Sequence, residues 1–199
     1  MLMADQTGRM SDDSHKRVEE CEAWIRDLYD RVARAEHRWT QYGDKNVYML
    51  VGAPGCGKST FRDKLLEKHP EAVTVSMDDF RLEWYGGSYD DAYLASTKDK
   101  KFGAKVDKAY VETLRGNDIV ILDNTNTVTK QRRRWLAPAR ARDFRVTAVL
   151  FPVALETIHA RQSKRDKFVP HNVVDRMYNR MQLPLIGDFD EVIVHDGNL

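Results

Sequence analysis

The spacing of hydrophobic positions changes near residue 46. From residue 12 to residue 39 apolar side chains recur every three or four positions, which predicts one amphipathic helix. The polar, glycine-containing stretch from 40 to 46 ends this pattern. We therefore divide the chain into an N-terminal helical extension, residues 1–46, and a second domain, residues 47–199. The extra helix is expected to pack on that domain; a homo-oligomer contact and the docking of a partner are the alternatives.

Beyond residue 46, short apolar runs alternate with amphipathic segments. Because parallel strands are joined by crossover helices of about ten or more residues, this alternation predicts an α/β fold, a mostly parallel sheet flanked by helices. Strands are expected at 47–51, 72–76, 119–122, 146–151 and 191–194, and helices at 59–68, 131–142, 155–164 and 171–181. The segment 89–115 is expected to be largely helical.

A glycine-rich loop follows the first expected strand and matches the pattern G-x-x-x-x-G-K-[ST]. Such loops turn backbone N–H groups toward phosphate oxygens, and the helix that follows adds its positive end. Lys58 supplies a mobile charge for the β- and γ-phosphates, and the Ser59 hydroxyl is a hard oxygen ligand for Mg²⁺. The sequence therefore predicts binding of ATP or another NTP with Mg²⁺, held by Gly52, Gly55, Cys56, Gly57, Lys58, Ser59 and Thr60.

Two acidic clusters follow the second and third strands, at the sheet edge where this loop lies. Asp78 is a candidate general base for an acceptor hydroxyl, and Arg81 can hold an acceptor phosphate. The alternative is that Asp78 and Asp79 only cap the next helix. In the second cluster Asp123 can hold Mg²⁺ or its water.

The same second cluster contains two amides, Asn124 and Asn126. They can bind the acceptor or support Asp78, but Asp, Asn and Thr are also ordinary turn residues. Further along the chain, Arg161 and Arg165 lie four positions apart and thus on one helical face. They are candidates for a lid over the γ-phosphate, and a solvated helix is the alternative.

These motifs together resemble the phage-type polynucleotide 5′-kinase family. The resemblance rests on the phosphate loop, the D-D-x-R element at 78–81, the cluster at 123–126 and the R-x-x-K-R element at 161–165. It implies a P-loop kinase domain that transfers the γ-phosphate of ATP to the 5′-hydroxyl end of RNA or DNA, in end repair. It implies that Lys58, Asp78, Arg81 and Arg165 are catalytic. Arg81 would contact the acceptor's phosphate, and Arg165, supported by Arg161, the donor phosphates.

Besides the extra N-terminal helix, the chain departs from that family at two points. The printed sequence has no D-x-D-G-T phosphatase motif, so no 3′-phosphatase activity is expected of it. The family has Asp-Thr-Asn at the third strand, and alignment on Trp135 places Asn124 on that Asp, with Asp123 one residue earlier. Which of the two residues takes the role stays open.

The net charge is +1, but residues 129–180 hold thirteen Lys and Arg against four Asp and Glu, a balance of +9. A local basic segment favours an anionic partner. We expect Arg132, Arg133 and Arg134, with Trp135 as a stacking ring, to bind the acceptor strand. The alternatives are a solvated helical face, a P-loop kinase of a small-molecule hydroxyl such as the zeta-toxin or antibiotic kinases, and a slowly hydrolysing NTP switch.

Composition adds two expectations about location. The chain has only two cysteines, and no apolar run approaches the about 18 residues that span a membrane. We therefore expect a cytoplasmic protein without a membrane partner.

Overall fold

The computed structural model describes residues 44–164 and 169–195. The helix predicted at 12–39, together with its packing and any oligomer contact, lies outside these residues. The boundary between the extension and the second domain therefore stays a prediction.

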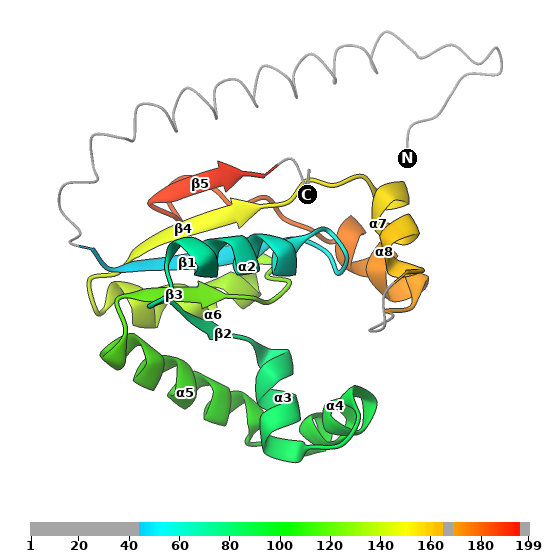
Figure 1. The fold of residues 1–199 in the computed structure, drawn as a ribbon, viewed down its shortest axis with the longest axis horizontal. Helices are drawn as coiled ribbons and strands as arrows, with labels where there is room; N and C mark the ends of the chain where they lie inside the picture. The colour runs from blue at the N-terminus through cyan, green and yellow to red at the C-terminus, as the bar shows by residue number, and fades with distance from the viewer. Residues whose placement is uncertain (1–43, 165–168, 196–199) are drawn as a thin grey trace, which may run out of the picture. The chain divides into compact units, whose positions relative to one another are not determined.

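The described strands form one parallel sheet in the order β2-β3-β1-β4-β5, and the predicted α/β fold class is confirmed. In Figure 1 the β1 and β4 strands run side by side toward the end of the sheet where α7 and α8 lie. Since β1 is hydrogen-bonded on both edges, the loop after it begins from a fixed point. The strands are β1 (Asn46–Val51), β2 (Val73–Val75), β3 (Ile119–Leu122), β4 (Arg145–Leu150) and β5 (Glu191–Val194).

The helices follow the predicted segments with two differences, described next. The described helices are α2 (Lys58–Lys68), α3 (Met77–Tyr85), α4 (Tyr89–Lys98), α5 (Phe102–Gly116), α6 (Thr129–Arg140), α7 (Leu155–Gln162) and α8 (His171–Asn179).

The prediction that 89–115 is largely helical is confirmed, but the segment forms two helices, α4 and α5, because the chain breaks at Asp99. This residue leaves the helical region, and its carboxylate accepts a hydrogen bond from the Lys101 backbone N–H at 2.7 Å. An Asp side chain that bonds the backbone two residues on competes with the helix. The helix α3 was not predicted as an element. Its cap is Ser76, whose hydroxyl accepts from the Asp79 N–H at 3.2 Å, so the two aspartates belong to its first turn.

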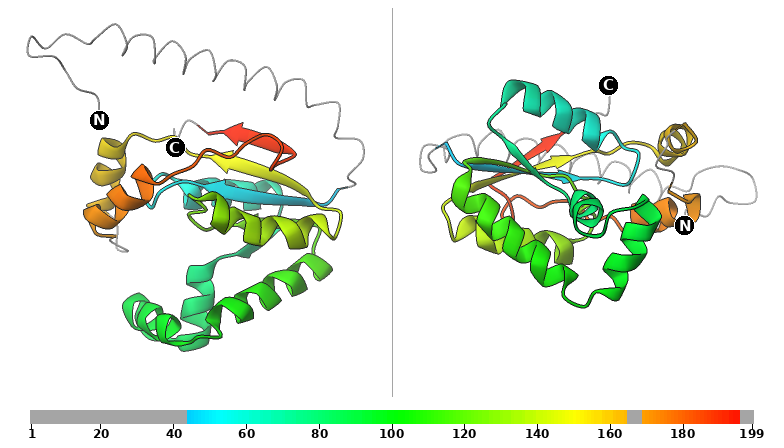
Figure 2. Two further views of the ribbon diagram at one scale, coloured as in Figure 1. Left: turned by 180° about the vertical axis from the view of Figure 1, so that it is seen from behind. Right: turned by 60° about the horizontal axis from the view of Figure 1, so that its bottom comes forward.

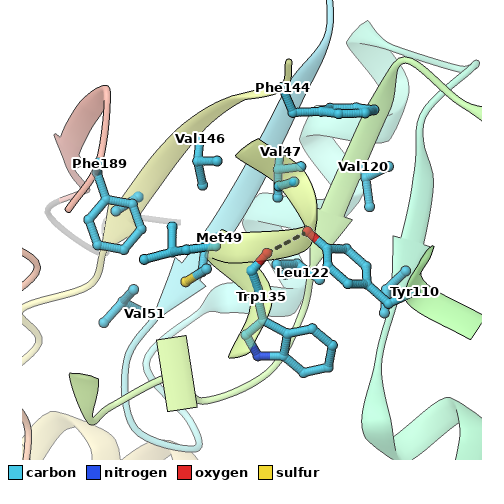
Figure 3. Close-up of a cluster of buried hydrophobic side chains, with 14 of the residues drawn as sticks. Val47, Met49, Val51, Tyr110, Val120, Leu122, Trp135, Phe144, Val146 and Phe189 are labelled. Carbon is cyan, nitrogen blue, oxygen red and sulfur yellow. Dashed lines mark hydrogen bonds between the residues drawn. The ribbon is translucent and has the colours of Figure 1, made fainter. Parts of the chain in front are cut away.

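Helices cover both faces of the sheet. Figure 2 (right) shows α2 on one side of the strands and α5 with α6 on the other. Alternate β1 side chains enter the two cores: Val47, Met49 and Val51 pack toward α5 and α6 (Figure 3), and Leu50 packs with Leu65 of α2. Burial on both faces explains the continuous apolar runs in the sequence. Within the described part of the chain, no helix has the length and apolar character needed to cross a membrane.

Candidate functional site

The glycine-rich loop turns from β1 into α2 through two left-handed glycines, Gly55 at φ 90° and Gly57 at φ 104°. Helix α2 begins at Lys58 with no side-chain cap and no acidic residue in its first turn. Its first N–H groups are therefore left for a ligand, and the positive helix end favours an anion. The Lys58 ammonium donates to the carbonyls of Gly52 and Ala53, each at 2.9 Å, which folds the amine back over the loop.

A cavity of about 700 Å³ opens in front of this loop. It is lined by residues that follow the carboxyl ends of β1, β2 and β3 and by residues of α2, α3, α4, α7 and α8, of which the last two are gold and orange in Figure 1. Five of the predicted phosphate-loop residues line it: Gly55, Gly57, Lys58, Ser59 and Thr60. Gly52 and Cys56 do not. A Cβ on Gly52 would lie 2.5 Å from the buried Cys56 sulfur. Gly52 and Cys56 therefore pack against each other and support the loop without lining the cavity.

We expect Gly55→Ala to weaken nucleotide binding about 5- to 30-fold, since a side chain at a left-handed φ costs about 1–2 kcal/mol. The added Cβ would also lie 2.9 Å from the Gln162 amide nitrogen. Equilibrium titration with a fluorescent nucleotide measures the change. Gly116→Ala is the control, since its Cβ meets nothing within 4 Å. Equal affinity of Gly55→Ala and wild type would show that this loop conformation does not carry the nucleotide.

The predicted base and its arginine are joined directly. Asp78 lines the cavity from the first turn of α3, and its Oδ1 accepts a hydrogen bond from the Arg81 guanidinium at 2.6 Å. The Arg81 Nε donates to the Ser96 hydroxyl at 3.1 Å, and the guanidinium lies over the rings of Tyr93 and Phe102. Arg81 thus lies behind Asp78 and is not among the lining residues.

At the end of β3, Asp123 points into the cavity and is largely buried. Its Oδ2 accepts from Arg62 at 2.8 Å. Burial raises the pKa of the Asp123 carboxyl above its ordinary value, while Lys58 and Arg62 act in the opposite direction. Carboxylate and hydroxyl oxygens are hard donors, so Asp123 and Ser59, on the same cavity, form a donor set that suits Mg²⁺ bound mainly through phosphate and water.

The two asparagines hold the backbone. The Asn124 Oδ1 accepts from the Met77 N–H at 2.9 Å, which ties the β3 end to the start of α3, one residue before Asp78. Asn124 also lines the cavity. Asn126 is only 2% exposed, at φ 47°, and donates to the Leu50 carbonyl at 2.9 Å. Of the two alternatives, the structure therefore favours support of Asp78 by Asn124. The prediction that Asn126 contacts the acceptor is wrong, because its side chain is buried.

The first lid arginine lies at the cavity. Arg161, on α7, lines it, and its guanidinium donates to the Cys56 carbonyl at 3.4 Å. Arg165 lies outside the described residues, and its role stays a prediction.

The prediction that three consecutive arginines of α6 bind the acceptor strand is contradicted at the first of them, Arg132. Arg132 is 1% exposed, and its guanidinium donates to the carbonyls of Asn126 and Gln182, at 3.0 and 2.9 Å. Trp135, 2% exposed, packs edge-to-face against Tyr110, as Figure 3 shows, so it offers no face to a base. Arg132 cannot bind a strand from this position. It connects the loop after β3 to the segment after α8.

The remaining arginines of the basic segment point in different directions. Arg134 forms an ion pair with Asp107 on α5 and lies over the Trp135 ring. Arg145 pairs with Glu191 at the start of β4, the end of the sheet opposite the cavity. Arg133 is exposed and stays a candidate for strand contact. The excess of +9 therefore does not form one continuous track.

Two residues at the cavity were missed by sequence reasoning. The Tyr89 hydroxyl donates to Asp78 Oδ1 at 2.9 Å, and Arg62 holds Asp123. Arg62 lies four residues after Lys58, one helical turn, and that spacing was a usable signal. The signal for Tyr89 was the glycine pair at 86–87, which predicts a chain reversal just before it.

Known proteins are similar to this chain in sequence and in fold. The bifunctional polynucleotide phosphatase/kinase of Schizosaccharomyces pombe is 26% identical over 145 residues, which cover 72% of this chain and 28% of that protein. The chain thus spans just over a quarter of this relative's length.

Two solved structures share the fold. One, of the Pnkp1/Rnl/Hen1 RNA repair complex, has a TM-score of 0.56 and 24% identity and covers 68% of this chain and 43% of the other. The other, a fungal RNA kinase, has a TM-score of 0.51 and 18% identity and covers 78% and 75%. The family model described as an AAA domain matches residues 47–184, from β1 to beyond α8. Since this match spans well over half of the sequence, the chain belongs to the AAA domain family, a P-loop fold that implies nucleotide binding.

Proposed function

We propose that the protein is a polynucleotide 5′-hydroxyl kinase of the phage-type group, which transfers the γ-phosphate of ATP or another NTP to an RNA or DNA end in nucleic-acid repair. One observation carries this proposal. Asp78, held by Arg81, faces the phosphate loop across a single cavity. The similarity to a polynucleotide phosphatase/kinase supports the choice of acceptor.

In this proposal the donor triphosphate lies on the loop residues, with Lys58 on its β- and γ-phosphates. Ser59, and Asp123 directly or through water, would hold Mg²⁺, which would supply positive charge to the phosphates. Arg161, and Arg165 beyond the described residues, supply positive charge at the transferring group.

The chemical step needs a proton acceptor on the side of the acceptor hydroxyl. Asp78 takes the proton of the 5′-hydroxyl while the hydroxyl oxygen forms its bond to the γ-phosphorus. The bond from the γ-phosphorus to the bridging oxygen breaks, and the nucleoside diphosphate leaves with the electron pair. Arg81, directly behind Asp78, is proposed to contact the phosphate next to the acceptor nucleotide. Its guanidinium would then be shared between that phosphate and the Asp78 carboxylate.

A small-molecule hydroxyl is the second candidate acceptor. It is favoured by the burial of Arg132 and Trp135, which removes the continuous strand track expected on α6. A cavity of about 700 Å³ also suits a ligand of modest size.

Acceptor competition separates the candidates. With γ-labelled ATP, we expect label on a 5′-hydroxyl oligonucleotide, no label on the same oligonucleotide carrying a 5′-phosphate, and no label on an aminoglycoside or a sugar. Preferred labelling of a small acceptor supports the second candidate. Label found only as inorganic phosphate identifies an NTP hydrolase.

A further inference from the structure

A glycine turn reverses the chain after α3 and places α4 against it. Gly86 and Gly87 have φ of 64° and 71°, conformations that side chains rarely adopt. Ser88 then caps α4 by accepting from the Asp91 N–H at 3.2 Å. Figure 1 shows α4 lying beside α3 below the sheet. The turn therefore brings Tyr89, the first residue of α4, to Asp78.

Helix α4 supports both donors that hold the Asp78 carboxylate. The Tyr89 hydroxyl and the Arg81 guanidinium donate to the same oxygen, Oδ1, at 2.9 and 2.6 Å. Arg81 is in turn held by the Ser96 hydroxyl and by the ring of Tyr93, 5.1 Å away. Two donors from two helices limit rotation of the carboxylate about its Cβ–Cγ bond.

The phenol of Tyr89 is a donor throughout the neutral range. Burial, followed by the nearby Asp78 carboxylate and the hydrogen bond to it, raises the pKa of Tyr89 above its ordinary value. A protonated phenol stabilises the charged carboxylate over the neutral acid, because only the carboxylate accepts strongly.

We propose that Tyr89 is a positioning residue for phosphate transfer, whose hydroxyl fixes the orientation and the charged state of Asp78. This inference rests on the proposed function, in which Asp78 accepts the proton of the acceptor hydroxyl. It adds α4 to the machinery of the site. The Tyr89 hydroxyl would help to set the pH range in which Asp78 acts as the base. Other charged groups surround Asp78: Arg81 and Asp79 on α3, Asp90 on α4, Asp123 after β3, Lys58 and Arg62 on α2, and Arg161 on α7.

The test compares Tyr89→Phe with Tyr85→Phe. Tyr85, on α3, donates to Asp99 at 2.7 Å, so both variants lose one phenol–carboxylate hydrogen bond, but only Tyr89 lines the cavity. For Tyr89→Phe we expect kcat to fall about 10- to 100-fold, the range for a hydrogen bond to a charged group. The KM for ATP should not change. The acid limb of its pH–rate profile should move about one unit to higher pH, since the carboxylate loses a donor. Tyr85→Phe should keep the wild-type profile.

A second measurement is independent of activity. Carbon-13 NMR follows the titration of the Asp78 carboxyl, assigned with Asp78→Asn. Its midpoint should move to higher pH in Tyr89→Phe and stay in place in Tyr85→Phe; an unchanged midpoint in Tyr89→Phe overturns the inference. An active wild type with the same pH–rate profile as Tyr89→Phe also overturns it, while the proposed function stands. If the wild type phosphorylates no acceptor but the midpoint still moves in Tyr89→Phe, the proposed function is overturned and Tyr89 remains the group that holds Asp78.

Discussion

Asp78→Asn is expected to lower kcat for phosphate transfer about 10²- to 10⁴-fold, the usual contribution of general acid–base catalysis. The amide keeps the size of the carboxylate but cannot take the proton of the acceptor hydroxyl. Nucleotide binding should stay within about threefold of wild type, because Lys58 and the backbone N–H groups carry the phosphates. Steady-state kinetics with a 5′-hydroxyl oligonucleotide and a nucleotide titration measure the two quantities.

Asp90→Asn is the matched control for this change. Asp90 is an exposed carboxylate that lines the same cavity from α4, so its replacement removes an equal charge from the cavity. We expect its kcat to stay within about threefold of wild type, because it supplies no general base. If Asp78→Asn instead loses nucleotide affinity as strongly as turnover, Asp78 acts on the metal or the nucleotide. If both variants lose the same activity, only the total negative charge matters.

The second large effect concerns stability. We expect Arg132→Ala to lower the free energy of unfolding by about 3–5 kcal/mol, since it opens a cavity and leaves buried carbonyls without a donor. Arg132 donates to Asn126 and Gln182, and also to Leu183 and the Thr129 hydroxyl. Denaturant unfolding measures the change as a lower midpoint with an unchanged slope.

The neighbouring arginine provides the control. Arg133 is exposed, so Arg133→Ala should alter the unfolding free energy by less than about 0.5 kcal/mol. If Arg133 contacts the acceptor strand, its loss reduces the salt slope of oligonucleotide binding by about one. A wild-type stability of Arg132→Ala combined with lost oligonucleotide binding would return Arg132 to the substrate surface.

The strands and the phosphate loop were predictable because their signals are local. The apolar runs at 47–51 and 119–122 need burial on both faces, and the loop's residue types fix its conformation wherever it occurs. The roles of the arginines on α6 depend on direction. Consecutive helical residues are turned by about 100°, so Arg132, Arg133 and Arg134 cannot share one face. Their positions as neighbours in the sequence made them look like one patch.

Contacts between elements distant in the sequence could not be predicted from its pattern, for another reason. The hydrogen bond from Tyr89 to Asp78 depends on where the glycine turn places α4, and the burial of Asn126 depends on β1 beside it. Turn chemistry predicts that the chain reverses but not which side chain it meets. Ser76 as the cap of α3 was readable, since Ser is a preferred cap residue and Asp79 follows three positions later.

The position of the transferred phosphate tests the central claim most directly. The wild-type protein is incubated with γ-labelled ATP, Mg²⁺ and a 5′-hydroxyl oligonucleotide, and the product is digested to 5′-mononucleotides. The account predicts that all label in the oligonucleotide is recovered in the mononucleotide from its 5′ end. Label that stays in free phosphate, appears in a small acceptor or comes from any other position of the oligonucleotide contradicts it.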